Sequence, residues 1–228
     1  MHIVLTDVLA CPRCGPEFGL VILADRIEDR RVIEGWLGCA NCREQYPVRG
    51  GVADLRWGFE PEGTDSSCVE EAEEQVAGGI AEGGDFAEGR DPEKPLRMAA
   101  LLGLTAPSPP VAVVSDDPAL VKEIQELLPD SAVVGVSREV PDNVEAVRTG
   151  WLLAGARLPF RSRSLAGVVL TAGATSERVS EALRCLVREA RLVIEPAPGG
   201  AAEMIRREGA RLLLEQDRVA VASDPRAG

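Results

Sequence analysis

Two short segments, Cys11-Pro12-Arg13-Cys14 and Cys39-Ala40-Asn41-Cys42, decide how the first part of this 228-residue chain folds. Each carries two cysteines in a C-x-x-C spacing, which turns both sulfurs to one side of a tight turn. Twenty-four residues separate the pairs, and this pattern is typical of one tetrahedral zinc site with four thiolate ligands. We therefore predict that Cys11, Cys14, Cys39 and Cys42 bind one zinc ion.

The residues between the two pairs favour a zinc ribbon. Two strand-like runs, 18–24 and 31–37, flank a charged turn, which gives a knuckle, a hairpin and a second knuckle within residues 1–57. The alternatives are two disulfides, four free thiols or a redox C-x-x-C, but C-x-x-C is a poor spacing for structural disulfides. Four cysteines close the coordination sphere, and the only histidine is His2, so we expect a structural metal.

Composition limits the classes of function. The formal net charge is −12, which argues against a protein that mainly coats nucleic acid, because phosphate contacts need a basic face. The start of the chain has no basic segment followed by an apolar core, and prolines break the longest uncharged run, 98–115. We expect no membrane span and a soluble protein in a reducing cytoplasm.

The acidic charge is concentrated in one segment. Residues 58–94 contain twelve acidic and two basic residues together with seven glycines. This composition predicts a flexible linker over 58–95, in which 66–77 could form a short acidic helix capped by Ser66 or Ser67. The segment is either a solvated spacer or an acidic arm that docks on a basic partner.

From residue 96 onward the pattern alternates between helices and strands. It predicts helices at 96–102, from 118 toward Pro129, at 143–147, from Ser176 to about Ala190, and at 201–208. Apolar strands are predicted at 111–114, 132–136, 150–154, 167–170 and 192–194, and a terminal hairpin at 211–215 and 219–222. Repeated β-α units of this kind predict an α/β domain over 96–228, with a parallel sheet covered on both faces and an antiparallel edge.

The first part of the chain resembles a small zinc-ribbon family. The resemblance covers about residues 3–56 and rests on the segments 9–14 (LACPRC), 39–42 (CANC) and 46–52 (YPVRGGV). That family includes the activator subunit that partners eukaryotic tRNA, rRNA and release-factor methyltransferases, and the same ribbon occurs fused to bacterial methyltransferase domains. This chain departs from the family at Arg43, where a glycine is usual. The resemblance implies work through contact with a partner protein.

Residues 96–228 resemble class I S-adenosylmethionine-dependent methyltransferases. The segment 156–170 (ARLPFRSRSLAGVVL) is similar to their Leu-Pro-Phe segment and fourth strand, and 181–194 to the helix and strand that follow. The resemblance implies a Rossmann-like sheet of the methyltransferase type with a terminal antiparallel hairpin.

The cofactor residues of that family are missing. Its glycine-rich loop corresponds here to Ser115, Asp116 and Asp117, which contain no glycine and two carboxylates that repel the cofactor's own carboxylate. After the second strand, Ser137-Arg138 replaces an acidic residue, and Ala154 and Ala166 fall near two further acidic positions. Each lost charge-assisted hydrogen bond costs about 1.5–3 kcal/mol, so we expect no S-adenosylmethionine binding and no catalytic residues.

A few further residues are candidates on weaker grounds. Glu195 ends a strand, where α/β enzymes often place functional groups, whereas Cys68 and Cys185 are expected to be ordinary thiols. The arginines Arg157, Arg161 and Arg163 form either a solvated face or a surface for an acidic partner or an RNA backbone. We therefore expect a non-catalytic scaffold or subunit that contacts a protein partner within a larger assembly; the alternative is an active methyltransferase acting on RNA or protein.

Overall fold

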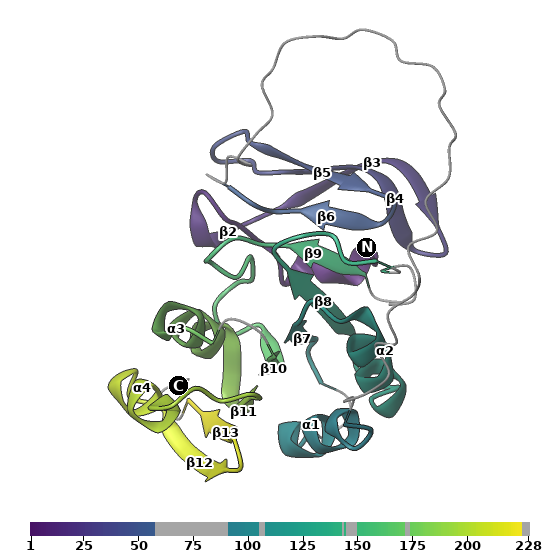
Figure 1. Cartoon of the computed structure of the whole chain (residues 1–228). Helices are drawn as coiled ribbons and strands as arrows, with labels where there is room; N and C mark the ends of the chain where they lie inside the picture. Colours follow the sequence, from purple (N-terminus) through teal and green to yellow (C-terminus); the bar gives the residue numbers. More distant parts are fainter. Residues whose placement is uncertain (58–90, 105–107, 143, 145–149, 172–173, 225–228) are drawn as a thin grey trace, which may run out of the picture.

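The computed structural model describes residues 1–57, 91–104, 108–142, 144, 150–171 and 174–224 (Figure 1). Most of the acidic segment expected as a linker over 58–95 lies outside these residues, as do Cys68 and the helix expected at 66–77. Only residue 144 of the helix expected at 143–147 is described.

The first 57 residues form a small antiparallel β-unit. Its elements are a 3-10 helix and six strands: η1 Ile3–Asp7, β1 Ala10–Cys11, β2 Gly15–Gly19, β3 Val21–Glu28, β4 Arg31–Gly38, β5 Gln45–Arg49 and β6 Val52–Asp54. The expected hairpin is present as β3 and β4, and Asp29 and Arg30 at its turn both have positive φ, as a tight two-residue hairpin requires. The expected strand 18–24 is divided at Leu20, because Phe18 belongs to β2, which pairs with β1.

The remaining residues form alternating helices and strands. They are α1 Lys94–Leu102, β7 Val111–Val114, α2 Pro118–Leu127, β8 Val133–Ser137, β9 Trp151–Leu153, β10 Leu165–Leu170, α3 Ser176–Cys185, β11 Leu186–Ile194, α4 Ala201–Arg207, β12 Arg211–Gln216 and β13 Val219–Ser223. The terminal hairpin β12–β13 is confirmed, and its turn residues Asp217 and Arg218 again have positive φ.

One helix is shorter in the structure than the sequence predicted. The pattern predicted a helix from Ser176 to about Ala190, but α3 ends at Cys185 and the chain enters β11 at Leu186. Leu165 of β10 pairs with Leu186, and the register then shifts so that Gly167 pairs with Arg191. The bulged strand accommodates Glu189 with positive φ. Pairing with β10 therefore overrides the local helical periodicity of 186–190.

Eleven strands form one sheet in the order β12-β13-β11-β10-β7-β8-β9-β6-β5-β4-β3. The strands from β11 to β9 are parallel to their neighbours, and their spatial order corresponds to the 3-2-1-4-5 arrangement of Rossmann-like sheets. The hairpin β12–β13 adds antiparallel strands at one edge. The fold is therefore the expected Rossmann-like α/β class with a terminal antiparallel hairpin.

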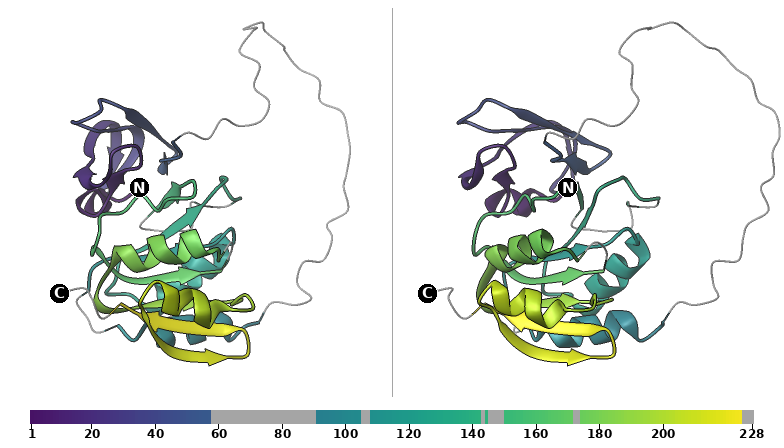
Figure 2. Two further views of the ribbon diagram at one scale, coloured as in Figure 1. Left: turned by 90° about the vertical axis from the view of Figure 1, so that its left-hand side faces the viewer. Right: turned by 60° about the vertical axis from the view of Figure 1, so that its left-hand side comes forward.

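The cysteine-bearing unit continues this sheet. Strand β6 pairs in parallel with β9, placing Val52 opposite Trp151 and Asp54 opposite Leu153. Figure 1 shows this unit stacked beyond β9, and Figure 2 shows the same arrangement from the side. A second contact joins β1 to the Leu-Pro-Phe segment, where Leu9 forms a β-bridge with Phe160. The two expected parts of the chain therefore share one β-sheet.

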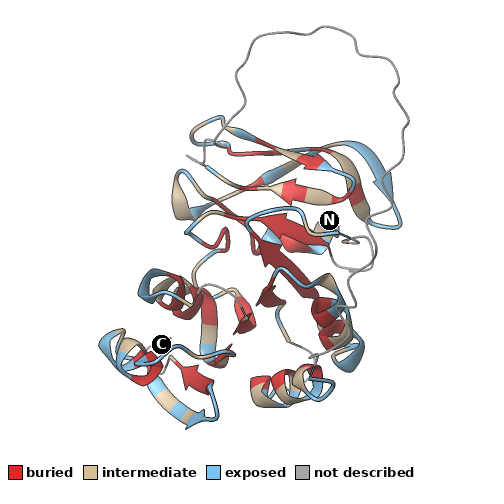
Figure 3. Ribbon diagram, viewed as in Figure 1, coloured by how far each residue is buried: buried red, intermediate tan, exposed pale blue. Residues whose placement is uncertain are grey.

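The sheet has a separate core on each face, and the central strands are buried (Figure 3). Along β7 the side chains alternate: Val111 and Val113 pack in the core that includes residues of α1 and α2. Ala112 and Val114 pack in the opposite core, which includes residues of α3, α4 and the cysteine-bearing unit. The N-terminal unit thus shares a hydrophobic core with the helices α3 and α4.

Among the described residues, no helix combines the length and the apolar character needed to cross a membrane.

Candidate functional site

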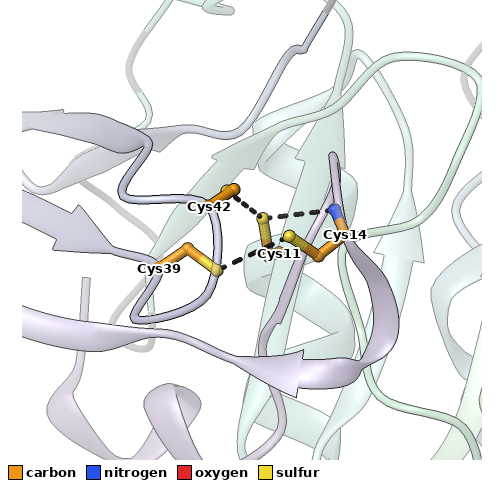
Figure 4. A group of neighbouring side chains, drawn as sticks. All are labelled: Cys11, Cys14, Cys39 and Cys42. Carbon is orange, nitrogen blue, oxygen red and sulfur yellow. Dashed lines mark hydrogen bonds between the residues drawn. The ribbon is translucent and has the colours of Figure 1, made fainter.

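The four predicted ligands come together. The sulfur atoms of Cys11, Cys14, Cys39 and Cys42 all lie within 4.8 Å of one another (Figure 4). The Cys11–Cys42 and Cys14–Cys39 sulfur pairs are 3.7 and 3.8 Å apart. Zinc–sulfur bonds of about 2.3 Å in a tetrahedron place neighbouring sulfurs about 3.8 Å apart. The donor set and its spacing therefore fit a zinc ion, and the four cysteines are free rather than paired in disulfides.

Local backbone geometry brings the sulfurs together. Cys11 ends β1 and Cys14 lies in the turn before β2, where Gly15 has φ +101°, a conformation that glycine adopts at little cost. Cys39 follows β4, and Arg43 after the second pair has φ +62°. Its backbone N–H donates to the carbonyl of Cys39 at 2.9 Å and closes the second knuckle. A glycine would adopt this left-handed conformation at lower cost than arginine.

Polar groups around the cluster suit thiolate ligands. The hydroxyl of Tyr46 is hydrogen-bonded to the Cys11 sulfur at 3.3 Å, and the side-chain amide of Asn41 donates to the Cys14 sulfur at 3.3 Å. Burial opposes ionisation of Cys39, but hydrogen bonds from the backbone of Cys42 and Asn41 outweigh it and lower the Cys39 pKa to about 7. Burial raises the pKa of Cys11 and of Cys42, so the hydrogen bonds favour the ionised form at Cys39, and the contacts of Tyr46 and Asn41 orient the ligands.

The loop after β7 is closed by its own hydrogen bonds. Asp117 is the N-cap of α2, and its carboxylate accepts hydrogen bonds from the backbone N–H groups of Ala119 and Leu120 at 2.9 and 3.2 Å. The hydroxyl of Ser115 accepts the N–H of Asp117 at 3.1 Å. Donors that a helix N-terminus could offer to a bound anion are therefore used within the loop.

A cavity of about 680 Å³ lies at the carboxyl ends of β7 and β8, beside the N-terminus of α3. It is lined by Val114, Ser115, Asp116, Ser137, Arg138, Ala156, Thr175, Ser176, Glu177 and Arg178. Ligands of Rossmann-like folds bind at this edge of the sheet. Of the three loop residues singled out in the sequence, Ser115 and Asp116 line this cavity, whereas Asp117 lines a different one beside α1.

The polar side chain at the end of β8 is also engaged in hydrogen bonds within the protein. The indole N–H of Trp151 donates to the hydroxyl of Ser137 at 2.7 Å, and that hydroxyl donates to the carbonyl of Glu139. Arg138 follows and is exposed. Ala154 and Ala166, expected near two lost acidic positions, are buried and do not line the cavity; Ala156 does.

The residues that the sequence indicated on weaker grounds take part in ion pairs, lie in the core or lie at the surface. Glu195 is held by Arg97 through two hydrogen bonds of 3.1 and 2.5 Å, which connect β11 to α1. Cys185 is fully buried, and this burial raises the pKa of its thiol to about 12. Arg157, Arg161 and Arg163 are exposed, and the last two line a shallow cavity together with Arg184.

Sequence reasoning missed Arg178. It lies in the first turn of α3, is only 7% exposed and lines the cavity after β7 and β8. Its neighbour Val179 carries the apolar periodicity of the helix, so nothing in the local pattern marks Arg178 as buried. The Thr-Ser pair before it, typical of a helix start, could have indicated that this residue lies at the carboxyl edge of the sheet.

No family model and no curated protein matches the sequence. Among solved structures, the chain is similar to a precorrin-6y C5,15-methyltransferase from Geobacter metallireducens, at 15% identity over 57% of this chain and 87% of that one, with a TM-score of 0.46. A 1,6-didemethyltoxoflavin-N1-methyltransferase from Burkholderia thailandensis matches at 15% identity over 58% and 79%, with a TM-score of 0.41. A 16S rRNA methyltransferase from T. thermophilus matches at 16% identity over 54% and 37%, with a TM-score of 0.39.

These structural neighbours are methyltransferases, and two of them are described in complex with S-adenosylhomocysteine or S-adenosylmethionine. The chain thus combines a Rossmann-like sheet with an N-terminal cluster of four cysteines that could hold a zinc ion.

Proposed function

We propose that this protein is a non-catalytic, methyltransferase-like subunit with a structural zinc centre, and that it acts as a scaffold through contacts with a protein partner. The observation that carries the proposal is the closed loop after β7, in which Asp117 takes the N–H groups of Ala119 and Leu120. A cofactor carboxylate would meet occupied donors there and the additional charge of Asp116, which lines the cavity.

The end of β8 supports the same conclusion. Ser137 is engaged by Trp151 and Glu139, so its hydroxyl already has a donor and an acceptor. Arg138 beside it offers only donors, whereas the hydroxyls of a ribose are best held by a carboxylate that accepts from both. The residues present at this position therefore do not fit S-adenosylmethionine.

The metal would stabilise the unit that extends the sheet. Four thiolates leave no coordination position for a substrate or a water, so the ion would supply folding free energy and no reaction step. Cys11 and Cys14 would fix β1, and Cys39 and Cys42 would fix the end of β4.

The outer hairpin of this unit supports a role in protein contact. Strand β3 is the last strand of the sheet, and its Val21 and Leu23 are 54% and 47% exposed. Trp36 of β4 lies opposite Leu23 in the register and is 39% exposed, so the three side chains share one face of the hairpin. Aromatic side chains such as that of Trp36 are enriched at the centres of protein interfaces, and exposed apolar neighbours extend the surface that a partner could cover.

Calorimetric titration of the full chain with S-adenosylmethionine tests the loss of cofactor binding. We expect no binding heat, whereas micromolar affinity would overturn the proposal. The cavity of about 680 Å³ favours one alternative, an active methyltransferase, because its volume is typical of ligand sites. Micromolar binding together with methyl transfer to RNA or protein would establish that alternative.

Co-purification from the native cells with Leu23→Glu tests the partner contact. We expect the partner to be lost with this variant and retained with Leu213→Glu, which changes a leucine of similar exposure, 41%, on the opposite edge hairpin. A partner retained equally by both variants would exclude the outer hairpin as the contact surface.

A further inference from the structure

The cavity at the ends of β7 and β8 contains a positive charge without a counter-ion. Arg178 is 7% exposed and lines this cavity. Within the described residues its guanidinium has no hydrogen bond and no ion pair, and its nitrogen atoms are open to the solvent that enters the cavity. Burial, and then the charge of Arg138, lower the pKa of Arg178, which reflects the cost of holding this cation where it lies.

Another arginine of the same helix, Arg184, has hydrogen-bond acceptors for its guanidinium group. Arg184 donates to the carboxylate of Glu181 and to the carbonyls of Phe160 and Leu158, with distances between 2.8 and 3.0 Å. The two arginines lie six residues apart on α3, and the side chain of Arg184 is 24% exposed. Arg178 therefore lacks a partner because of its position at the cavity, and not because it lies on α3.

The charges around Arg178 do not neutralise it. Arg138 lines the same cavity and repels it, while Glu177, Glu181 and Asp116 exert a weaker favourable effect. None of these carboxylates forms an ion pair with Arg178 among the described residues, and Glu181 is already engaged by Arg184. Glu177 and Asp116 are exposed, so solvent screens their charge. Two guanidinium groups facing one cavity favour an anion between them.

The end of α3 adds to this preference. The helix has ten residues and is capped by Thr175, whose hydroxyl accepts the N–H of Arg178 at 3.2 Å. Thr175 and Ser176 also line the cavity, so the positive end of the helix dipole faces it. Helix N-termini and the planar fork of guanidinium groups both match the oxygens of a phosphate group.

We propose that this cavity binds a small phosphorylated molecule through its phosphate group, held by Arg178, Arg138 and the N-terminus of α3. The proposal rests on the proposed function in one respect, that the cavity does not hold S-adenosylmethionine. The cavity at the cofactor position of a methyltransferase-like fold would then bind an anion in place of the usual cofactor.

Thermal unfolding and calorimetry of the full chain test the proposal, with inorganic phosphate, adenosine 5′-monophosphate and adenosine as probes. We expect both phosphate-containing probes to raise the midpoint of the native chain and adenosine to leave it unchanged. Arg178→Met should weaken phosphate binding by about tenfold or more and leave the midpoint in phosphate-free buffer unlowered, because the guanidinium has no partner in the fold to lose. Arg211→Met, at an exposed arginine of β12, should change neither quantity.

If Arg178→Met fails to fold, Arg138→Gln can be tested in its place, because Arg138 is exposed. We expect Arg138→Gln also to weaken phosphate binding. Equal phosphate responses in the native chain and in Arg138→Gln or Arg178→Met, or no response of the native chain, would overturn the anion site. A parallel titration with S-adenosylmethionine separates the two proposals. If neither phosphate nor S-adenosylmethionine binds, only the anion site is overturned. If S-adenosylmethionine binds, the proposed function is overturned, whether or not phosphate also binds.

Discussion

The backbone N–H of Ala10, next to the predicted ligand Cys11, donates to the carbonyl of Pro159 at 2.9 Å. This bond joins the cysteine cluster to the Leu-Pro-Phe segment of the α/β part, and a second bond returns from the N–H of Arg161 to the carbonyl of Val8 at 2.8 Å. Because the metal would fix β1, its loss should loosen the segment that β1 holds and, through β6, the edge strand β9.

Metal removal should therefore destabilise the whole described fold. Zinc binding contributes on the order of 10 kcal/mol to the folding of small thiolate sites. We expect a chelator or Cys39→Ser to lower the unfolding midpoint and to speed amide exchange in Trp151–Leu153 as well as in β4. Cys68→Ser, at a cysteine that is not one of the four predicted ligands, should retain one zinc per chain. Unchanged exchange in β9 after metal loss would show that the two parts are not coupled.

Arg43 should tolerate glycine better than a branched residue. Its φ of +62° is costly for any side chain, by about 1–2 kcal/mol, and most costly for a β-branched one. We expect Arg43→Val to lower the free energy of unfolding by roughly 1 kcal/mol, the extra cost of a β-branched side chain over the native arginine, and to weaken zinc affinity, and Arg43→Gly to do neither. Arg49→Val is the matched control, since Arg49 is an exposed arginine in β5 with ordinary strand geometry. Equal losses at both positions would contradict this assignment.

The cysteine cluster was predictable because its geometry is local. Two C-x-x-C turns and a short hairpin between them leave little freedom for the sulfurs, and Gly15 marks the first turn in the sequence. The β-α alternation likewise gave the strands β7 to β10 and the final hairpin, since continuous apolar runs and turn residues are local signals.

The contact between the two parts was not predictable in the same way. Strands β6 and β9 have three residues each and are distant in sequence, so no local pattern indicates that Val52 pairs with Trp151. The end of α3 at Cys185 also depends on a distant partner, Leu165. The burial of Arg178 depends on how α3 packs against the sheet, which is a tertiary property that a helical pattern does not contain.

Gly135 should be required by its neighbour on the next strand. A Cβ atom at this position would lie 2.2 Å from Cε3 of Trp151, whose ring is 1% exposed. We expect Gly135→Ala to destabilise the protein by about 1–3 kcal/mol, because the buried ring has no room to move. Gly155→Ala should be neutral, since no atom lies within 4 Å of its Cβ position. The double variant Gly135→Ala with Trp151→Leu should lose less than the sum of the single losses; strict additivity would exclude the clash.

Glu195 should stabilise the fold by fixing α1. Its carboxylate is 13% exposed and accepts two hydrogen bonds from Arg97, which also contacts Asp91 at 2.7 Å. The hydrogen bonds of Glu195 and then of Asp91 raise the pKa of Arg97, which stays charged. We expect Glu195→Gln to cost about 1–3 kcal/mol in chemical denaturation, because it weakens a charge-assisted pair at a mostly buried position.

The matched variant Asp91→Asn should cost less than Glu195→Gln, since Asp91 is 47% exposed and its pair with Arg97 is screened by solvent. A double-mutant cycle between Glu195 and Arg97 should give a coupling energy larger than that between Asp91 and Arg97. If Glu195→Gln left stability unchanged, the carboxylate would not be the link between β11 and α1, and its position at the end of a parallel strand would again indicate a site residue.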